Sequence, residues 1–331
     1  MKRNNMLTDK EKLVLEEIKK NPLIRQEELS DKLSISRLAI ATHISNLQKK
    51  GFIIGRGYFL NYPSNISIIG GINLAFIGKS NEKFENSRNN LGTFNISIKG
   101  TIYNIFSFLS KLEKDINYIS FIGDDFYGDE IKKIIKKYKI NSIELFKVYG
   151  QRTSLYTSLE SKDSQSIGAI LSMELFDNIT LNEFQNILPK IRNSSILYMD
   201  ANYPIEIINE VANLNKNKYM IYNNITTLQT YKQSEIKFKY NFLCTSLKEA
   251  NKMFDKKLKT ELELYDFLKE NNVEAGMIYS KEKVLIFEDS SKFELDTTNI
   301  REYYISKIIY LKKNKKNILK EEFKYAKNKT I

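Results

Sequence analysis

The chain has 331 residues, 52 of them Lys or Arg and 40 of them Asp or Glu, which gives a formal net charge of +12. At about 150 residues per domain this length predicts two domains, and the 42% hydrophobic content excludes a disordered or collagen-like chain. One cysteine, Cys244, and one histidine exclude an internal disulfide and a structural zinc site, so we expect no metal centre. Because the N-terminus lacks a signal-peptide pattern and no long apolar span occurs, we expect a cytoplasmic protein without a membrane partner.

The excess positive charge lies at the two ends of the chain. The first 60 residues hold 12 basic and 7 acidic side chains, the last 31 hold 10 and 3, and the residues between them hold 30 of each. Because phosphate binding increases with local Lys and Arg density, one end is expected to meet a polyanion. For the basic C-terminal tail at residues 311–331, a solvated lysine-rich helix is the favoured alternative.

Two helices are predicted in the first 33 residues. Thr8 and Glu11 have the spacing of a capping box, and the apolar stripe after them predicts a helix that runs to about Lys20. A second, shorter helix fits Gln26 to Leu33, because two of its leucines lie one turn apart.

A third helix and a hairpin complete the first domain. Ser36 is the predicted N-cap of a helix over residues 37–50, and Gly51 stands where a left-handed residue ends a helix. Residues 52–60 fit two short strands around an arginine between glycines. Three helices and a hairpin predict a winged helix over residues 1–60, whose third helix enters the major groove of double-stranded DNA.

Polar side chains on the third helix are candidates for DNA contact. Those at its start would meet bases, and lysines at its end would hold phosphates. Arg37 begins the third helix, and Arg56 lies at the tip of the hairpin, which forms the wing. The alternative for both arginines is a surface charge without a partner, but these positions favour DNA contact. For His43, packing against the wing is as well supported as DNA contact. The predicted DNA-binding residues are Ser36, Arg37, Thr42, His43, Lys49, Lys50 and Arg56.

The segment at residues 21–60 resembles the N-terminal winged helices of many bacterial regulators. It looks especially like the module that precedes the kinase domain in some pseudouridine and other sugar kinases. The resemblance extends nearly from one end of this segment to the other.

After a linker at residues 61–65, strand and helix patterns alternate along the chain. Apolar runs such as Ile66–Ile69 and Tyr118–Ile122 have the β-branched and aromatic composition of strands. The alternation predicts an α/β domain over residues 66–310, with a mostly parallel sheet covered by helices on both faces.

Several short motifs of this domain follow one another in a recognisable order. They are G-x-N-x-x-x-x-G at 71–78, Lys99-Gly100 with Asn104, IGDDFYG at 122–128, LYMDANYP at 197–204 and Asp296-Thr297-Thr298. This order resembles the ribokinase-like (PfkB) carbohydrate kinases, and pseudouridine kinases with an N-terminal winged helix are the most similar members. The resemblance implies a ribokinase-like α/β sandwich.

The resemblance also implies which residues bind a substrate or ligand. These are Asn73, Gly100, Asn104 and Asp124. The alternative is that they stabilise turns of the fold without binding a ligand. For Gly100 and Asp124, ligand binding and a structural role in a turn are equally supported. Ala75 stands where the family has the aspartate that holds sugar hydroxyls, so that carboxylate is missing.

The catalytic segment departs from the family. Where the family has G-A-G-D, this chain has Asn299-Ile300-Arg301-Glu302, so both glycines that permit close phosphate approach are replaced. Glu302 is the candidate catalytic base, although its extra methylene displaces the carboxylate. Glu249, the only retained residue of the family's N-x-x-E, and Arg301 are the candidate nucleotide or phosphate ligands.

We interpret the chain as a DNA-binding transcriptional regulator that acts as a homodimer. Its PfkB-like domain would be a pseudokinase that serves ligand sensing or dimerisation, and no cofactor is assigned to it with certainty. The resemblance implies that the effector would be a sugar or nucleoside. The alternative is an active sugar or pseudouridine kinase that uses ATP and Mg²⁺ and carries a DNA-binding module. In a third interpretation the kinase-like domain is only a scaffold or a dimerisation body.

Overall fold

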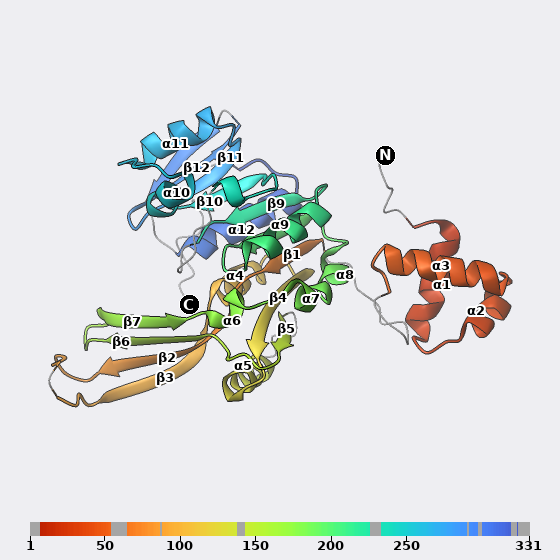
Figure 1. The fold of residues 1–331 in the computed structure, drawn as a ribbon, viewed down its shortest axis with the longest axis horizontal. Coiled ribbons are helices and arrows are strands. Elements are labelled where there is room, and N and C mark those ends of the chain that lie inside the picture. Colours follow the sequence, from red (N-terminus) through yellow and green to blue (C-terminus); the bar gives the residue numbers. More distant parts are fainter. Residues whose placement is uncertain are drawn as a thin grey trace.

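The N-terminal helices follow the predicted pattern (Figure 1). They are α1 (Asp9–Lys20), α2 (Gln26–Leu33) and α3 (Arg37–Lys49). Their apolar side chains form a core of their own. The computed structural model describes residues 7–53, 65–86, 88–137, 143–225, 233–289, 291–296, 300–318 and 323.

The predicted helix caps are confirmed. Thr8 and Glu11 exchange backbone and side-chain hydrogen bonds at the start of α1, and the Ser36 hydroxyl accepts a backbone N–H at the start of α3. Gly51 has a φ of +78° just after α3, as a left-handed helix end requires. The helix itself ends at Lys49 rather than Lys50.

The hairpin predicted after α3 is described only at its beginning. Ile53 is buried in the core of α1, α2 and α3, and Phe52 packs against it. Residues 54–64, which include Arg56 and most of the predicted linker, lie outside the described residues.

The rest of the chain is built on a larger sheet. Its strands are β1 (Ile66–Ile69), β4 (Ile116–Gly123), β5 (Ile143–Val148), β8 (Ile196–Asp200), β9 (Tyr219–Asn223), β10 (Phe242–Thr245), β11 (Ala275–Tyr279), β12 (Lys283–Glu288) and β13 (Ser291–Asp296). Their order is β13-β12-β11-β10-β9-β8-β1-β4-β5. All neighbours pair in parallel except β11 with β12 and β12 with β13. The predicted mostly parallel sheet is therefore confirmed.

Helices cover both faces of this sheet, as predicted (Figure 1). One face packs against α4 (Thr101–Leu109), α5 (Phe126–Lys137) and α12 (Arg301–Lys313). The other packs against α6 (Glu174–Asp177), α7 (Leu181–Gln185), α8 (Leu188–Ile191), α9 (Ile205–Leu214), α10 (Leu247–Phe254) and α11 (Glu261–Glu270). A short 3₁₀ helix, η1 (Gln233–Glu235), precedes β10. Cys244, in β10, is fully buried in the core shared with α4 and α12.

A smaller sheet projects from this body (Figure 1). Its strands are β2 (Asn73–Ser80), β3 (Gly92–Lys99), β6 (Leu155–Glu160) and β7 (Ser166–Ser172), in the order β3-β2-β6-β7. This second sheet is not predicted from the sequence. Most residues of β3 and β7 are exposed. The apolar residues of these strands therefore give no alternating pattern of buried and exposed positions from which the sheet could be predicted.

The winged helix contacts the body where α3 ends. The Arg192 guanidinium, just after α8, donates to the Lys49 carbonyl, and the Asn193 amide donates to the Gly51 carbonyl at 3.3 Å. A Cβ on Gly51 would lie 3.1 Å from the Pro189 carbonyl oxygen. Gly51 therefore both ends the helix and allows α8 to approach it.

The C-terminal helix continues past the predicted end of the domain at residue 310. Leu311, Ile318 and Phe323 are buried in the core beside α4, so the described part of the predicted tail belongs to the body. Among the described residues, no helix is both long enough and apolar enough to span a membrane.

Candidate functional site

The outward side of α3 carries most of the predicted DNA-binding residues. The exposed ones are Ser36, Arg37, Thr42 and Lys49. The Arg37 guanidinium lies 2.9 Å from Glu27 Oε1 in an exposed ion pair, and the Thr42 hydroxyl donates to the Leu38 carbonyl at 2.9 Å. Since the Leu38 side chain is also exposed, this side presents both polar and apolar groups, the two kinds that can contact base edges.

Lys50 and His43 are placed differently from the other predicted residues. Lys50 Nζ lies 2.5 Å from Glu11 Oε2 and joins the end of α3 to α1. Burial acts to raise the pKa of the Glu11 carboxyl, but hydrogen bonds from Lys50 and Thr8 hold it below its usual value. His43 is half-buried, and its Nδ1 has no hydrogen-bond partner among the described residues. Lys50 thus has a partner inside the domain.

A second group of predicted residues gathers at one edge of the larger sheet. The parallel strands β1, β8, β9 and β10 end there, and α4, α10 and α12 begin beside them. In open α/β sheets ligands bind at this edge. The first turns of these helices supply Gly100, Asn104, Glu249, Arg301 and Glu302.

Gly100 holds the start of α4 against the glycine pair that follows β1. Its φ of +114° is accessible without strain only to glycine, and a Cβ here would lie 2.5 Å from the Gly71 carbonyl oxygen. The Ile102 N–H donates to the same oxygen at 3.2 Å. These contacts give Gly100 a structural task, which is to bring α4 close to β1.

Asp200, at the end of β8, is a buried carboxylate that is not among the predicted site residues. It accepts hydrogen bonds from the Thr101 hydroxyl, from the Gly71 N–H at 3.2 Å and from the Asn202 N–H at 3.1 Å. Burial raises the pKa of Asp200 to about 6, and these donors limit the rise. Its signal in the sequence is an acidic residue that closes the apolar strand LYMD within LYMDANYP.

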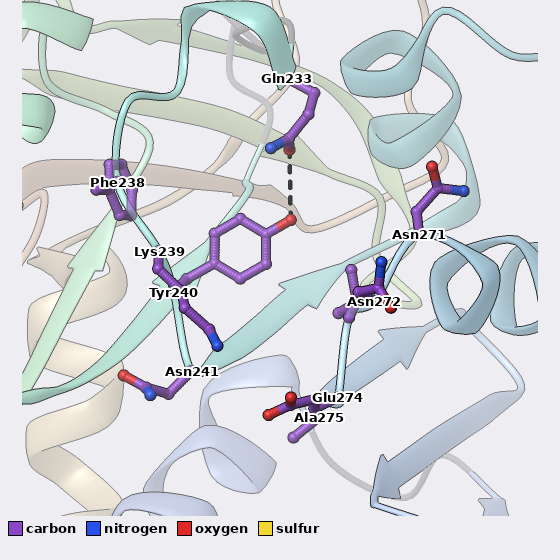
Figure 2. A pocket seen from close by; sticks show the side chains of 10 residues that line it. Gln233, Phe238, Lys239, Tyr240, Asn241, Asn271, Asn272, Glu274 and Ala275 are labelled. Carbon is purple, nitrogen blue, oxygen red and sulfur yellow. Dashed lines mark hydrogen bonds between the residues drawn. The ribbon is translucent and has the colours of Figure 1, made fainter.

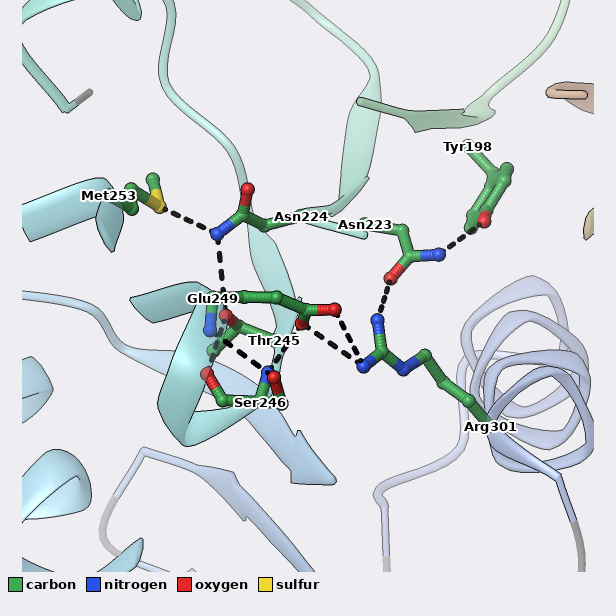
Figure 3. Close-up of polar contacts among 8 residues, drawn as sticks. All are labelled: Tyr198, Asn223, Asn224, Thr245, Ser246, Glu249, Met253 and Arg301. Atoms are coloured by element: carbon green, nitrogen blue, oxygen red, sulfur yellow. Dashed lines mark hydrogen bonds and ion pairs between the residues drawn. The ribbon is translucent and has the colours of Figure 1, made fainter. Parts of the chain in front are cut away.

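Arg301 turns inward from the first residue of α12 and pairs with Glu249 (Figure 3). One guanidinium nitrogen lies 3.0 Å from both carboxylate oxygens, and the side chains are only 11% and 6% exposed. The other donates to Asn223 Oδ1 at 3.4 Å, and the Asn223 amide donates to the Tyr198 hydroxyl at 2.8 Å. Burial acts to lower the pKa of the Arg301 guanidinium, but the charge of Glu249 outweighs it and raises that pKa.

Glu249 also caps α10. Its Oε2 accepts the Ser246 N–H at 2.7 Å, and the Glu249 N–H donates to Ser246 Oγ at 3.3 Å, which together form a capping box. Both carboxylate oxygens of Glu249 are therefore engaged by groups of the protein itself.

Glu302 follows Arg301 but points into the protein, where it is 7% exposed. Burial raises the pKa of the Glu302 carboxyl, and its own N–H, the charge of Arg301 and the side chain of Asn104 partly offset this. A buried carboxylate of raised pKa at a helix start is a reasonable general base. Asn104 is half-buried on α4.

The two remaining predicted ligand residues differ in burial. Asn73 begins β2 and is 7% exposed, and its Oδ1 has no partner among the described residues. Asp124 is exposed and accepts the Gly150 N–H at 3.0 Å, while its neighbour Asp125 accepts the Thr153 N–H at 2.9 Å. Both carboxylates of IGDDFYG therefore hold turns, and Asn73 is the better candidate for ligand contact.

These contacts determine how the site fits a magnesium nucleotide. Glu249 and Arg301 are bound to each other, and across the described parts of the chain no three His, Cys, Asp or Glu side chains are arranged to hold a metal ion. Arg301 also places a charged side chain where glycine would leave the helix N–H groups open to an anion. The two candidate nucleotide ligands among the described residues are therefore engaged with each other.

Comparison with known proteins agrees with this architecture. Residues 63–316 match the model of the pfkB family carbohydrate kinase, and residues 7–54 match the model of winged helix-turn-helix DNA-binding. A relative in Escherichia coli (strain K12), the "uncharacterized sugar kinase YeiI", is 31% identical over 208 residues, which are 63% of this chain and 58% of that protein. The chain thus matches less than two thirds of that relative's length.

Solved structures with much lower identity have the same fold. A carbohydrate kinase from Agrobacterium tumefaciens superposes with a TM-score of 0.64 at 18% identity, over 76% of this chain and 85% of that one. The Arabidopsis thaliana ribokinase complexed with ribose and ATP gives 0.59 at 12% identity, over 77% and 87%. The predicted ribokinase-like fold is confirmed.

Proposed function

Because the chain belongs to the pfkB family of carbohydrate kinases and carries a winged helix-turn-helix DNA-binding domain, we propose that it is a transcriptional regulator with a degenerate kinase domain. Its partner is double-stranded DNA, which α3 would read in the major groove. The PfkB-like domain transfers phosphate weakly or not at all, and it serves ligand sensing or dimerisation.

The Arg301–Glu249 pair is the observation that carries this proposal. Phosphoryl transfer depends on positioned donors for the migrating group and on a metal that neutralises its charge. Here a buried guanidinium is held by both carboxylate oxygens of Glu249. Removing one partner of such a pair costs about 3–5 kcal/mol, because it leaves a buried charge uncompensated. A nucleotide phosphate or a metal ion that used either side chain would have to displace this contact first.

Nucleotide binding and turnover test the kinase part directly. Calorimetry with ATP and Mg²⁺, followed by phosphotransfer assays on ribose, pseudouridine and related nucleosides, is expected to give neither binding nor product. Arg301→Gly is expected to gain ATP binding because it frees Glu249, whereas Arg88→Gly, which breaks an exposed pair with Glu85, is not. Turnover by the parent protein would overturn the pseudokinase.

The DNA-binding part has its own test. Sites selected from a random DNA pool are expected to bind the parent, and Arg37→Ala/Thr42→Ala is expected to weaken that binding by about tenfold, the size of one good base contact. Lys162→Ala, on an exposed turn, serves as the control. Equal binding by all three proteins would exclude this side of α3 as the DNA contact.

A sensing role is supported by the substrate end of the site. Asn73 keeps a buried oxygen without a described partner, and Asn104 lies half-buried nearby on α4. A sugar or nucleoside offers hydroxyl donors for such an oxygen. Calorimetry against these ligands is expected to show heat that Asn73→Ala removes. No heat and no thermal shift would exclude sensing and leave DNA binding untouched.

A homodimer is supported by one face of the smaller sheet. On it Phe94, Ile96 and Ile170 are 73%, 55% and 76% exposed. The residues that pair across the four strands at these positions are all uncharged. One set of paired residues consists of Phe94, Gly78, Leu159 and Gly168, and the other consists of Ile96, Phe76, Thr157 and Ile170. An uncharged face suits a second copy of this basic chain, and winged helices commonly read paired half-sites.

The dimer is tested by light scattering on the purified protein. The parent is expected to have twice the mass of the chain, and Phe94→Ser/Ile170→Ser is expected to be monomeric. Leu262→Ser removes an exposed leucine from α11 and is expected to leave the mass unchanged. A monomeric parent would refute the dimer.

The burial of Glu302 favours an active sugar or pseudouridine kinase as the second candidate. A carboxylate with a raised pKa at the start of α12 can accept a proton from a substrate hydroxyl. This candidate predicts ATP-dependent turnover that Glu302→Gln abolishes. A parent that is inactive, or no more active than Glu302→Gln, would dispose of it.

A further inference from the structure

A basic hollow lies at the edge of the larger sheet opposite the candidate site. It has a volume of about 320 Å³ and is formed by the end of α9, the turn into β9 and residues 237–239. Its cations are Lys216, Lys218, Lys237 and Lys239. No carboxylate is among the described residues that line it, so their charges add at one place on the surface.

The adjoining hollow shows that this charge is local (Figure 2). It shares Phe238 and Lys239 with the basic hollow, but its other described lining residues include Glu274 and several amides and no further lysine. The Tyr240 hydroxyl donates to Gln233 Oε1 at 3.3 Å inside it. Two hollows of similar size thus lie side by side, and only one concentrates positive charge.

Lys218 is the innermost cation of the basic hollow. It is half-buried, and its Nζ donates to the Ile191 carbonyl at the end of α8. Burial and the neighbouring charge of Arg192 lower the pKa of the Lys218 ammonium to about 7. In the described part of the chain none of the hollow's four lysines forms an ion pair. A bound anion would accept charge-assisted hydrogen bonds from these lysines.

The hollow is linked to the DNA-binding domain through Arg192. The positive charge of Arg192 contributes to the lowered pKa of the Lys218 ammonium. The Arg192 guanidinium also donates to the Lys49 carbonyl at the end of α3. We propose that the basic hollow is a binding site for phosphate groups, separate from the kinase-like site and next to the attachment of the winged helix. The phosphate belongs either to a small phosphorylated ligand or to the DNA backbone beside the α3 contact.

Pyrophosphate is the probe for the first source, and calorimetry on the full chain is the measurement. The parent is expected to bind it, and Lys216→Met/Lys239→Met is expected to weaken binding about tenfold. Both lysines are exposed, so this double variant is expected to fold. Lys218→Met provides a second variant of the hollow, and its methionine keeps an apolar side chain at this half-buried position. Lys162→Met/Lys257→Met removes the same charge from exposed positions elsewhere and is expected to bind like the parent.

The salt dependence of DNA binding tests the second source, and this measurement alone depends on the proposed DNA binding. If the hollow holds backbone phosphates, the slope of log K against log salt becomes shallower by about 1 for each contact that Lys216→Met/Lys239→Met removes. An unchanged slope together with weakened pyrophosphate binding assigns the hollow to a small ligand. If the slope is unchanged, either equal pyrophosphate binding by the hollow and control variants or no pyrophosphate binding at all overturns the proposal.

Discussion

The first turns of α4 and α12 border the same site but differ in what occupies them. At α4, Gly100 leaves room for the backbone of Gly71, and the helix starts in tight contact with β1. At α12, the corresponding space receives the side chain of Arg301, which is bound by Glu249 from α10. One helix start is thus packed against the backbone of the glycine pair, while the other carries a charge that a neighbouring helix neutralises.

This difference separates binding from catalysis. A helix start that keeps its glycine can still position side chains for a ligand, whereas one that carries a paired arginine offers its charge to a neighbour rather than to a phosphate. The α4 end is therefore a structural element, and ligand binding there is part of the proposed sensing function. The α12 end is a buried ion pair whose first effect is on stability.

The Arg301–Glu249 pair gives the largest expected effect. Arg301→Met is expected to cost about 4 kcal/mol of unfolding free energy, because it leaves a buried carboxylate unpaired. In Arg301→Met/Glu249→Gln most of this loss should be regained, since Gln also serves in a capping box. Urea unfolding measures both changes.

A surface pair provides the control for that experiment. Lys283 and Glu294 are 56% and 43% exposed, so Lys283→Met is expected to cost less than about 1 kcal/mol. If Arg301→Met cost no more than this, the buried pair would not be holding the α12 end in place.

Asp200, which accepts a hydrogen bond from Thr101 of α4, provides a pH-dependent test of the α4 end. Its folded pKa of about 6 lies above its ordinary value of 3.8, so its contribution to stability is complete below about pH 4 and is lost as the pH rises through 6. At about 1.4 kcal/mol per pKa unit, the loss amounts to about 3 kcal/mol. The difference in unfolding free energy between the parent and Asp200→Asn should fall by this amount between pH 4 and 7, and a flat difference would contradict the assignment.

Gly100→Ala tests whether the tight start of α4 is required. The new Cβ would meet the Gly71 carbonyl at a φ of +114°, which is expected to lower the unfolding free energy by about 2 kcal/mol. Gly150 is the matched control, because its φ is +74° and nothing lies within 4 Å of the position that a Cβ would take. Gly150→Ala is expected to cost about 1 kcal/mol, and equal thermal shifts for the two variants would show that the close approach is unimportant.

The start of α3 gives the smallest effect, because its ion pair is exposed. Glu27→Gln releases Arg37 from a pair in which both side chains are more than half exposed, so stability should change by less than about 0.5 kcal/mol. DNA affinity should rise about twofold to threefold at low salt and less at high salt, because a negative charge near the DNA is removed. Fluorescence anisotropy at two salt concentrations measures this, and a decrease in affinity would place Glu27 in the contact itself.

Local signals account for how much of the fold could be predicted. The capping box of Thr8 and Glu11, the Ser36 cap and the helix end at Gly51 each depend on neighbours within a few residues, and the structure confirms all three. The smaller sheet could not be predicted in the same way. Its strands pair residues as distant in the sequence as Leu74 and Leu155, and β3 and β7 bury little surface.

The site shows the same limit more strongly. Arg301 and Glu249 can each be identified by their place in a motif, but 52 residues separate them, and nothing local indicates that they bind each other. Asp200 likewise accepts hydrogen bonds from Thr101 and Gly71, which lie about a hundred residues away in the sequence. Sequence therefore identifies the parts of the site, whereas their electrostatic state is a property of the assembled fold.

Cys244 gives the chain an internal reporter of its own unfolding. The thiol is fully buried in the middle of the larger sheet, and burial raises its pKa far above the ordinary value, so a thiol reagent can attack it only when β10 becomes exposed. Since the sequence has a single cysteine, the rate of its labelling would measure the opening of this sheet without an engineered cysteine. Ligands that tighten the body would slow that rate, and substitutions that loosen it would accelerate it.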